Sequence, residues 1–288
     1  MPELPEVEVL VRHLDPLLRN RTIHKVMVRR ERVLRPTSAA KLKRALKGAT
    51  FSKISRRAKF LVFNLSSKDS KPLVVIGHLG MTGRMYVQPK RIRLAKHAAV
   101  VLDLGKDHFV FEDTRYFGRF TLDQSGLQSL GPEPLAGDFC ATEFSKSLAR
   151  SRQPIKVKLL DQRVVAGIGN IYASEALFRA GIPPRTPARK LKLRQVAALC
   201  HAIQKVLKEA IRFGSTVPLN FPGRGKTDGL FYYGAAEEAP SFYEERLRVY
   251  DREHRPCTRC RNPIKRIVQA ARSTFFCSNC QRMTKRSS

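Results

Sequence analysis

The sequence predicts a multidomain protein of the α+β class, in which strand-rich and helical parts follow one another. Residues 20–125 contain short segments rich in β-branched and aromatic residues, separated by turn residues. Residues 140–213 show helical periodicity, and residues 257–280 hold four cysteines in two close pairs. A chain of 288 residues is also long for a single hydrophobic core. We therefore expect an N-terminal helix with a β-sandwich or barrel, then a helical domain, then a small cysteine-rich module.

The first predicted element is an amphipathic helix that begins near residue 5. Pro5 suits the first helical turn, where its missing N–H costs nothing. Glu6 places a negative charge at the positive end of the helix dipole. The apolar residues that recur at helical spacing are Val7, Leu10, Val11, Leu14 and Leu18.

These helix signals leave Pro2 unexplained. If Met1 is removed, the chain begins with the secondary amine of Pro2 beside the carboxylate of Glu3. Such an amine can attack a carbonyl-like carbon and form an iminium ion. Most chain termini are frayed and idle. The terminus alone thus leaves open both a nucleophile and an inactive end.

The strand-rich part contains eight short candidate strands. This number of short strands at even spacing is typical of a β-sandwich or barrel. The segments are TIHKVMV (22–28), ATFSKIS (49–55), KFLVFNL (59–65), LVVIGHLG (73–80), RMYVQ (84–88), AAVVLDL (98–104), HFVFED (108–113) and RFTL (119–122). The Pro- and Gly-rich stretch at 131–139 then predicts a domain boundary.

The helical part contains two helices joined by a glycine-containing turn. Residues 155–161 predict one helix and residues 170–178 a second, and a further helix is expected within 186–212. Asn170 is a good candidate for the N-cap of the second helix. Helix N-termini that are reached through glycines bind phosphates. Residues 214–245 are rich in Gly and Pro and predict a long loop.

The charge of the chain indicates the class of its partner. The sequence has 55 Lys and Arg against 24 Asp and Glu, a formal net charge of +31. Such an excess points to a polyanion, and nucleic acid is the commonest one. The alternative is a basic surface that serves solubility only. Because the excess lies on segments with folded patterns and not in one tail, we favour a folded surface that faces DNA.

Four of the six cysteines form a metal-binding pattern. Two CxxC pairs separated by sixteen residues are a strong signal for tetrahedral zinc. The alternative, two disulfides, is unusual in an intracellular protein. The predicted ligands are Cys257, Cys260, Cys277 and Cys280. The isolated Cys140 and Cys200 are expected to be core thiols.

The residues between the two pairs predict a β-hairpin. Two short strands, 264–268 and 273–276, flank a turn at 269–272, so Arg272 lies near the tip. Such a module is too small to bury a core, and the metal takes the place of one. No apolar run approaches the roughly 20 residues of a membrane span, and no signal peptide is evident. We therefore expect an intracellular protein.

Several separated motifs closely resemble those of the bacterial formamidopyrimidine-DNA glycosylases. They are PELPEVE at 2–8, RRAKF at 56–60, HLGMTGR at 78–84, DTRYFG at 113–118, LLDQRVVAGIGNIYASEALF at 159–178, PCTRC at 256–260 and RSTFFCSNCQ at 272–281. The resemblance covers nearly the whole chain. It implies an N-terminal helix with a β-sandwich at 1–130, a helix–two-turns–helix domain at 131–250 with a lesion loop at 214–245, and a C-terminal β-hairpin zinc finger at 251–288.

The resemblance implies a base-excision-repair enzyme for oxidised purines, namely 8-oxoguanine and formamidopyrimidines. Pro2 corresponds to the nucleophile, which forms a Schiff base, and Glu3 to the general acid and base. Lys59 corresponds to a lysine beside the lesion; by itself it would be interpreted as a solvated lysine. β,δ-Elimination would then cut the strand. The implied cofactor is one structural Zn²⁺, and the implied setting is a monomer in the bacterial cytoplasm, acting on double-stranded DNA.

Further residues correspond to the family's DNA contacts. Asn170 and Arg272 match residues that grip the phosphates flanking the lesion, and Arg272 also counts among the catalytic residues. The remaining three fill the void left by an extruded base, with the arginine reading the opposite base: Met81, Arg115 and Phe117. From their pattern alone, Met81 and Phe117 are more often core residues.

The sequence departs from the family pattern in two places. The family commonly has a KHDH-like run, whereas this chain has Lys96-His97-Ala98-Ala99. His97 is therefore expected to bind DNA without the second histidine. The loop at 214–245 is about a dozen residues longer than usual, and in the family this loop closes over the damaged base.

Two rival interpretations remain. An endonuclease VIII-like enzyme of the same superfamily would prefer oxidised pyrimidines, but that branch typically has glycine where this chain has Leu4. A non-catalytic zinc-finger DNA-binding protein would explain the charge and the cysteines. It would not explain the intact Pro2-Glu3 terminus together with Lys59.

Overall fold

The computed structural model describes residues 2–213 and 246–282. These residues divide into two compact units, residues 2–128 and residues 129–213 with 246–282. The predicted lesion loop at 214–245 lies outside the described residues. The division into three domains at residues 130 and 250 remains a proposal.

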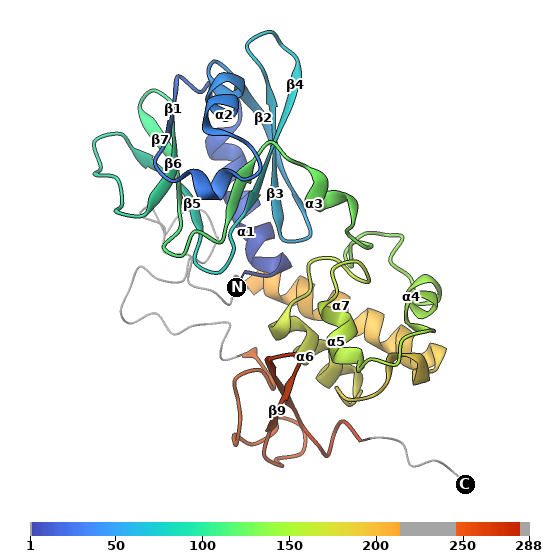
Figure 1. Ribbon diagram of the computed structural model, residues 1–288. Helices are drawn as coiled ribbons and strands as arrows, with labels where there is room; N and C mark the ends of the chain where they lie inside the picture. Colours follow the sequence, from blue (N-terminus) through green and yellow to red (C-terminus); the bar gives the residue numbers. More distant parts are fainter. Residues whose placement is uncertain (1, 214–245, 283–288) are drawn as a thin grey trace. The chain divides into compact units, whose positions relative to one another are not determined.

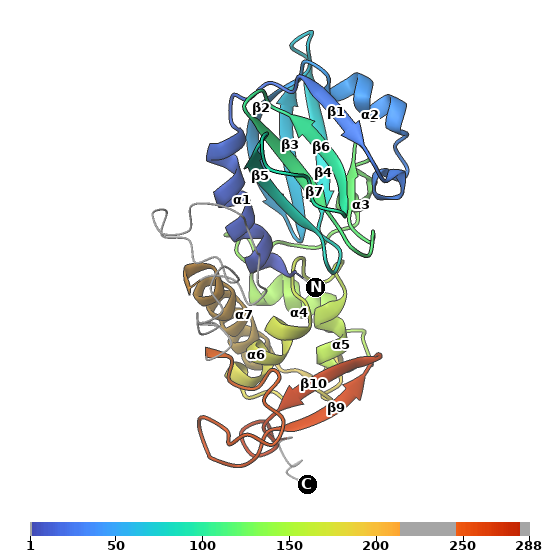
Figure 2. The ribbon, with the colours of Figure 1, turned by 90° about the vertical axis from the view of Figure 1, so that its left-hand side faces the viewer.

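The first unit contains two four-stranded antiparallel sheets that pack face to face (Figure 2). One sheet has the strand order β1-β6-β7-β5 and the other has the order β2-β3-β4-β8. The strands are β1 (Lys25–Val28), β2 (Thr50–Arg57), β3 (Phe60–Ser66), β4 (Pro72–His78), β5 (Arg84–Pro89), β6 (Ala98–Asp103), β7 (Asp107–Glu112) and β8 (Arg119–Thr121). Each of the eight predicted strands is therefore present, and the fold is a sandwich.

Three helices and one 3₁₀ helix accompany the sheets. Helix α1 and helix α2 flank the sandwich on opposite sides (Figure 2). The helical elements are α1 (Leu4–Leu18), η1 (Glu31–Leu34), α2 (Ala39–Leu46) and α3 (Ser125–Gln128). Helix α2 was not among the predicted elements, although Ser38 supplies a conventional N-cap by accepting a hydrogen bond from the Lys41 amide at 3.2 Å.

One hydrophobic core joins α1 to both sheets. The apolar stripe of α1 is fully buried at Leu10, Leu14 and Leu18. It packs with aromatic residues of the sheets, and the Phe63 ring lies 5.7 Å from those of Phe109 and Phe120. Burial of these large side chains fixes the start of α1 relative to the strands.

The second unit is helical and carries a two-stranded sheet. Helices α5 and α6 are joined by the turn 161–169, which is the helix–two-turns–helix arrangement implied by the sequence (Figure 1). The elements are α4 (Ala141–Leu148), α5 (Ile155–Leu160), α6 (Asn170–Ala180), η2 (Ala188–Lys190), α7 (Leu193–Phe213), β9 (Lys265–Gln269) and β10 (Arg272–Phe276). Cys200 is buried in α7, as expected, but Cys140 is exposed before α4, so its prediction as a core thiol is wrong.

The hairpin of β9 and β10 has a strained two-residue turn. Gln269 pairs with Arg272, which leaves Ala270 and Ala271 as the turn. Both alanines have left-handed backbones, with φ of 46° and 57°. Two-residue hairpin turns require this conformation, but it costs a non-glycine residue about 1–2 kcal/mol. Within the described ranges, no helix is long and apolar enough to cross a membrane.

His78, at the end of β4, gives the first unit a measurable pH dependence. Its Nδ1 accepts a hydrogen bond from the Gly80 amide at 3.1 Å, and its ring packs 4.9 Å from that of Phe60. Burial, reinforced by the charges of Lys59 and Arg119, lowers the pKa of His78 to about 4.

We predict that His78 titrates near pH 4 and destabilises the fold as the pH falls. An unfolded histidine takes up a proton near pH 6.5, whereas the folded one does not until about pH 4. Protonation therefore favours the unfolded chain, and stability is lost between these two pH values. Ring NMR signals and thermal melts at pH 7 and 4.5 measure both effects. In His78→Gln the difference between the two melts should shrink, and a ring titrating near 6.5 would contradict the prediction.

Candidate functional site: a buried helix start and a phosphate grip

The N-terminus of α1 is buried and held in a fixed conformation. Pro2 is buried, and Glu3, the N-cap residue, is 2% exposed. The Glu3 amide donates to Glu6 Oε2 at 2.6 Å, and the two glutamates form a capping box. The start of α1 is therefore ordered and not frayed.

Lys59 lies on the turn between β2 and β3 and is only 6% exposed. The interpretation as a solvated lysine is therefore wrong. Arg56 ties this turn to α1, because its Nε donates to Glu8 at 2.9 Å and its Nη1 donates to the Ala58 carbonyl at 3.1 Å. Ala58 itself has a left-handed φ of 54°. The Arg56–Glu8 ion pair thus links the turn that carries Lys59 to the first turns of α1.

The charge of Glu8 maintains this link. Burial alone would raise the pKa of Glu8, but hydrogen bonds and charges from Arg56 and Arg12 hold the pKa below its ordinary value. Glu8 is therefore ionised at neutral pH.

The three residues expected in the DNA void come together on two adjacent loops. Met81 is 47% exposed and Phe117 is 45% exposed, so neither belongs to the core. Arg115 joins them, since its Nη1 lies 3.4 Å from the Met81 sulfur and its guanidinium lies 4.8 Å from the Phe117 ring centre. The three side chains form one exposed apolar and cationic group.

Asp113, which was not predicted as a functional residue, holds the two loops together. It is fully buried. Its Oδ1 accepts from Thr82 Oγ1 at 2.6 Å and from the Arg115 amide at 3.2 Å, while its Oδ2 accepts from the Gly118 amide at 2.8 Å. Gly80 permits the close approach, because a Cβ there would lie 2.6 Å from the Gly118 nitrogen.

His97 makes a protein contact that the sequence did not suggest. Its Nδ1 lies 3.3 Å from the Tyr116 hydroxyl. Ala99, at the position of the family's second histidine, is fully buried within β6. Ala99 therefore offers neither the imidazole nor an exposed side chain at this position.

In the second unit, Asn170 and the start of β10 lie side by side. The cap residue of α6 is Gly169, so the interpretation of Asn170 as a simple N-cap is wrong. Its Nδ2 instead donates to the Ser273 carbonyl at 2.8 Å, next to Arg272. Its Oδ1 accepts from Lys156 Nζ at 2.6 Å. The fold therefore brings the Asn170 amide against the backbone of the strand that begins at Arg272, about a hundred residues away in the sequence.

Lys156 is fully buried, which the sequence did not reveal because the residue resembles any solvated lysine on a helix. The partial positive charge of the α6 N-terminus and the exposed Arg272 create a positive field. This corner of the second unit suits a phosphate group.

The four predicted metal ligands converge. Their sulfur atoms all lie within 4.8 Å of one another. Cys257 and Cys280 are 3.8 Å apart, and Cys260 and Cys277 are 3.5 Å apart. A zinc–sulfur bond of about 2.3 Å in a tetrahedron requires sulfur atoms roughly 3.8 Å apart, whereas a disulfide requires about 2.05 Å. The geometry thus fits zinc and excludes the two disulfides.

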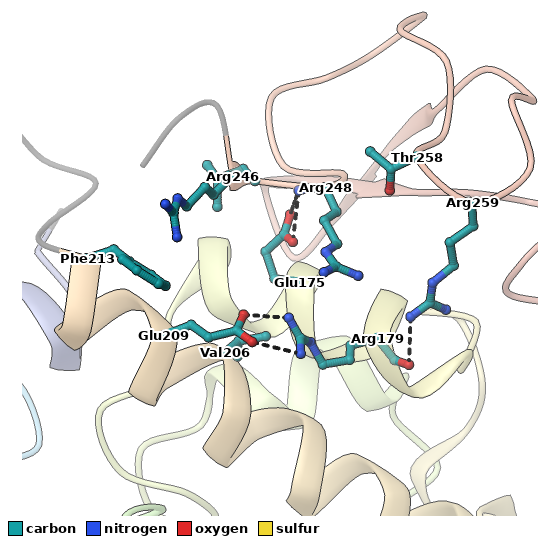
Figure 3. A pocket seen from close by; sticks show the side chains of 10 residues that line it. Glu175, Arg179, Val206, Glu209, Phe213, Arg246, Arg248, Thr258 and Arg259 are labelled. Atoms are coloured by element: carbon teal, nitrogen blue, oxygen red, sulfur yellow. Dashed lines mark hydrogen bonds and ion pairs between the residues drawn. The ribbon is translucent and has the colours of Figure 1, made fainter. Parts of the chain in front are cut away.

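A buried carboxylate attaches the zinc module to α6 (Figure 3). Glu175 accepts hydrogen bonds from the backbone amide of Arg248, drawn in Figure 3, and from those of Val249 and Tyr250, at 2.9–3.1 Å. Burial raises the pKa of Glu175, and these three amides offset part of that rise. Residues 248–250, in the segment that leads to the first CxxC pair, are thereby fixed to α6.

Two arginines that line a neighbouring cavity of about 540 Å³ make further contacts with α6 and α7 (Figure 3). Arg179 joins α6 to α7 through two bonds to Glu209, at 2.6 and 3.1 Å. Arg259 of the first cysteine pair donates to the carbonyls of Phe178 and Arg179 at the C-terminal end of α6. Because a cation is favoured at that end of a helix, Arg259 also interacts with the helix dipole.

Comparison with known proteins agrees with this arrangement. Residues 1–120 match the formamidopyrimidine-DNA glycosylase N-terminal domain, and residues 130–219 match the H2TH domain of the same enzyme. Residues 255–282 match a zinc finger found in these enzymes and in IleRS. A formamidopyrimidine-DNA glycosylase of Chloroflexus aurantiacus is 40% identical over 98% of both chains.

The chain belongs to the formamidopyrimidine-DNA glycosylase family. A relative from Desulfitobacterium hafniense is also 40% identical, over 98% of this chain and 100% of its own. Among solved structures, a Lactococcus lactis glycosylase bound to Fapy-dG-containing DNA has a TM-score of 0.83 at 30% identity. The same enzyme with abasic-site DNA has a TM-score of 0.84 at 29% identity. Both comparisons cover 98% of this chain and 100% of the other.

Membership of the glycosylase family and the sulfur geometry together assign one structural zinc ion to the four cysteines. The zinc module also packs on the helical domain, because Phe178 of α6 forms a buried cluster with Ile264 and Phe275. The sequence had indicated that the metal takes the place of a core in this module. The metal is instead only one part of the core, together with this apolar cluster.

We predict that Cys277→Ser removes the zinc and disorders β9 and β10, because a three-sulfur site binds zinc more weakly and the metal supports the fold. DNA affinity should fall at least about tenfold, since second-sphere and ligand losses at zinc sites act on this scale. Metal analysis and DNA titration test this expectation. The matched control is Cys140→Ser, an exposed cysteine outside the site, which should keep its zinc. Unchanged metal content in Cys277→Ser would contradict the assignment.

Proposed function

We propose that this chain is a base-excision-repair DNA glycosylase with AP lyase activity, acting on oxidised purines in double-stranded DNA. The observation that carries this proposal is the buried, capped start of α1, where Pro2 and Glu3 adjoin. A binding protein has no need to bury and order its first residues. The rival of a non-catalytic zinc-finger protein offers no role for this arrangement.

In the first step, the amine of Pro2 attacks C1′ of the damaged nucleotide after Met1 has been removed. The bond between C1′ and the base nitrogen breaks, and the bonding electrons leave with the base. Glu3 donates a proton to the ring oxygen of the deoxyribose, so the sugar opens as the iminium forms. Lys59, held by the Arg56–Glu8 pair, provides a positive charge near the lesion and its phosphate.

In the second step, the iminium makes the C2′ proton acidic. Removal of this proton breaks the bond from C3′ to its phosphate oxygen by β-elimination. A further δ-elimination breaks the bond from C5′ to its phosphate oxygen, so the strand is cut on both sides. The reaction uses no metal, and zinc serves the DNA grip of β9 and β10.

The exposed side chains prepare the substrate for this chemistry. Asn170 and Arg272 bind the phosphates beside the lesion, and His97 adds a further backbone contact. Met81 and Phe117 fill the void that the extruded base leaves, and Arg115 reads the opposite base, which is cytosine. Base extrusion costs a few kcal/mol, which these contacts offset.

A broader substrate range is the second candidate. One similar Lactococcus lactis structure, 30% identical with a TM-score of 0.83, contains DNA with an oxidised pyrimidine. Excision of an oxidised pyrimidine and of 8-oxoguanine should therefore be measured side by side. We expect faster excision of the purine. We also propose that the enzyme acts as a monomer in the bacterial cytoplasm.

We predict that borohydride traps a covalent complex with DNA containing 8-oxoguanine opposite cytosine, because the iminium is reducible. A variant that retains an N-terminal tag should give no trapped product, since its Pro2 nitrogen is an amide. Pro2→Gly, with a primary amine, should retain part of the lyase activity. A tagged protein that traps at the normal rate would refute the role of Pro2.

We predict that Arg115→Ala weakens the preference for cytosine over adenine opposite the lesion by about 1–3 kcal/mol, the value of one good base contact. The melting temperature should barely change, because Arg115 is exposed. Single-turnover rates on the two duplexes measure the preference. Arg44→Ala, which removes an exposed charge from α2, is the control. A large loss of stability with unchanged preference would mean that Arg115 is structural.

A further inference from the structure

Tyr116 lies in the segment 113–118 between β7 and β8, called here the reading loop. Its side chain packs toward the core, unlike those of its two neighbours. Arg115 and Phe117 are exposed, whereas Tyr116 is half-buried and packs against the core of the sandwich. Its backbone is left-handed, with φ of 54°. This conformation is uncommon for a bulky residue and requires support from its surroundings. The side chain of Tyr116 is therefore a candidate for that support.

Arg30 reaches the Tyr116 hydroxyl from the segment before η1. Its Nε donates to the hydroxyl oxygen at 3.2 Å, and its guanidinium lies 5.7 Å from the ring centre. The Arg30 amide donates to the carbonyl of Ala99 at 3.2 Å, and its Nη1 donates to the Arg29 carbonyl at 3.0 Å. The arginine is thus held by its backbone and its side chain, and it offers the hydroxyl a fixed donor.

His97 completes the chain of hydrogen bonds. Because the Tyr116 oxygen accepts from Arg30, its own O–H is free to donate to His97 Nδ1, 3.3 Å away. A histidine that accepts at Nδ1 carries its proton on Nε2. This tautomer presents the Nε2–H group, which can donate a hydrogen bond to a phosphate oxygen.

The ends of the reading loop are already fixed by other groups. Asp113 accepts from the amides of Arg115 and Gly118, and Arg119 donates to the carbonyls of Phe117 and Gly118. None of these bonds involves residue 116. The side chain of Tyr116 therefore adds the central anchor to a loop whose two ends are held separately.

We propose that Tyr116 is a positioning residue for base reading, whose hydroxyl, held between Arg30 and His97, sets the directions of Arg115 and Phe117 and fixes the tautomer of His97. This inference rests on the proposed roles of Arg115 and His97 in DNA recognition. It links the reading of the opposite base to a contact with the DNA backbone through a single hydroxyl group.

The test uses Tyr116→Phe, which keeps the ring and removes only the hydroxyl. The ratio of single-turnover excision rates opposite cytosine and adenine should fall about three- to tenfold, the scale of one lost hydrogen bond. Nitrogen NMR of His97 should change from the Nε2–H tautomer to a mixture. An unchanged ratio together with an unchanged His97 tautomer overturns the proposal.

Two further variants separate anchoring from other effects. Tyr86→Phe removes a hydroxyl that binds Glu112 at 3.1 Å in the same sandwich, and it should leave both readouts unchanged. Tyr116→Asn tolerates a left-handed backbone but lacks the hydroxyl at that reach. If Tyr116→Asn retains the full ratio, backbone conformation alone suffices and the anchor has no role. If it loses the ratio as Tyr116→Phe does, a residue that tolerates the left-handed backbone is not sufficient.

A double-mutant cycle tests whether Arg30 acts through the hydroxyl. Arg30→Met and Tyr116→Phe should each lower the ratio, and the double variant should lower it no further. Additive losses would overturn the arrangement. Failure of the proposed function is distinguishable, because it would appear in the unmodified protein as absent borohydride trapping, or as an unchanged ratio in Arg115→Ala.

Discussion

A carboxylate that is removed from water requires hydrogen-bond donors, and in this protein many of those donors are backbone amides of functional segments. Glu6 receives the amide of Glu3, Asp113 receives two amides of the loop that carries Arg115, and Glu175 receives three amides before the zinc module. Asp15 similarly accepts from the Ile54 amide at 2.7 Å and joins α1 to β2. In a chain with 24 acidic against 55 basic side chains, these few acids determine where the functional segments lie.

Fixed hydrogen-bond partners also order several of the basic side chains. The arginines nearest to functional segments are not simply exposed charges. Arg56 is held by Glu8, Arg179 by Glu209, and Arg259 by the carbonyls at the end of α6. Each is thereby given one orientation, whereas an arginine in solvent samples many. Electrostatic attraction brings a polyanion to the surface, but the geometry of the contacts comes from these fixed partners.

Much of the fold could be predicted because its signals are local. Eight strands and the zinc hairpin follow from short-range patterns, and four cysteines at metal spacing leave few alternatives. The short helix α2 was missed inside a strand-rich region, although Ser38 marks its start. The candidate site could be predicted only in part from the sequence. Asp113, Lys156 and Tyr116 act through partners that are distant in sequence or through burial, and neither property is visible in residue type or spacing. The left-handed backbone at Tyr116 likewise has no signal in the sequence.

The turn of Ala270 and Ala271 has a consequence for the order of folding. Two left-handed alanines disfavour the isolated hairpin by about 1–2 kcal/mol each, so β9 and β10 do not form early as an autonomous nucleus. They form when zinc gathers the cysteines and Phe178 of α6 is available for packing. Arg272 is therefore ordered only in a molecule whose helical domain is complete. The position of Arg272 thus depends on the cysteine cluster and on α6 and not on the hairpin turn alone.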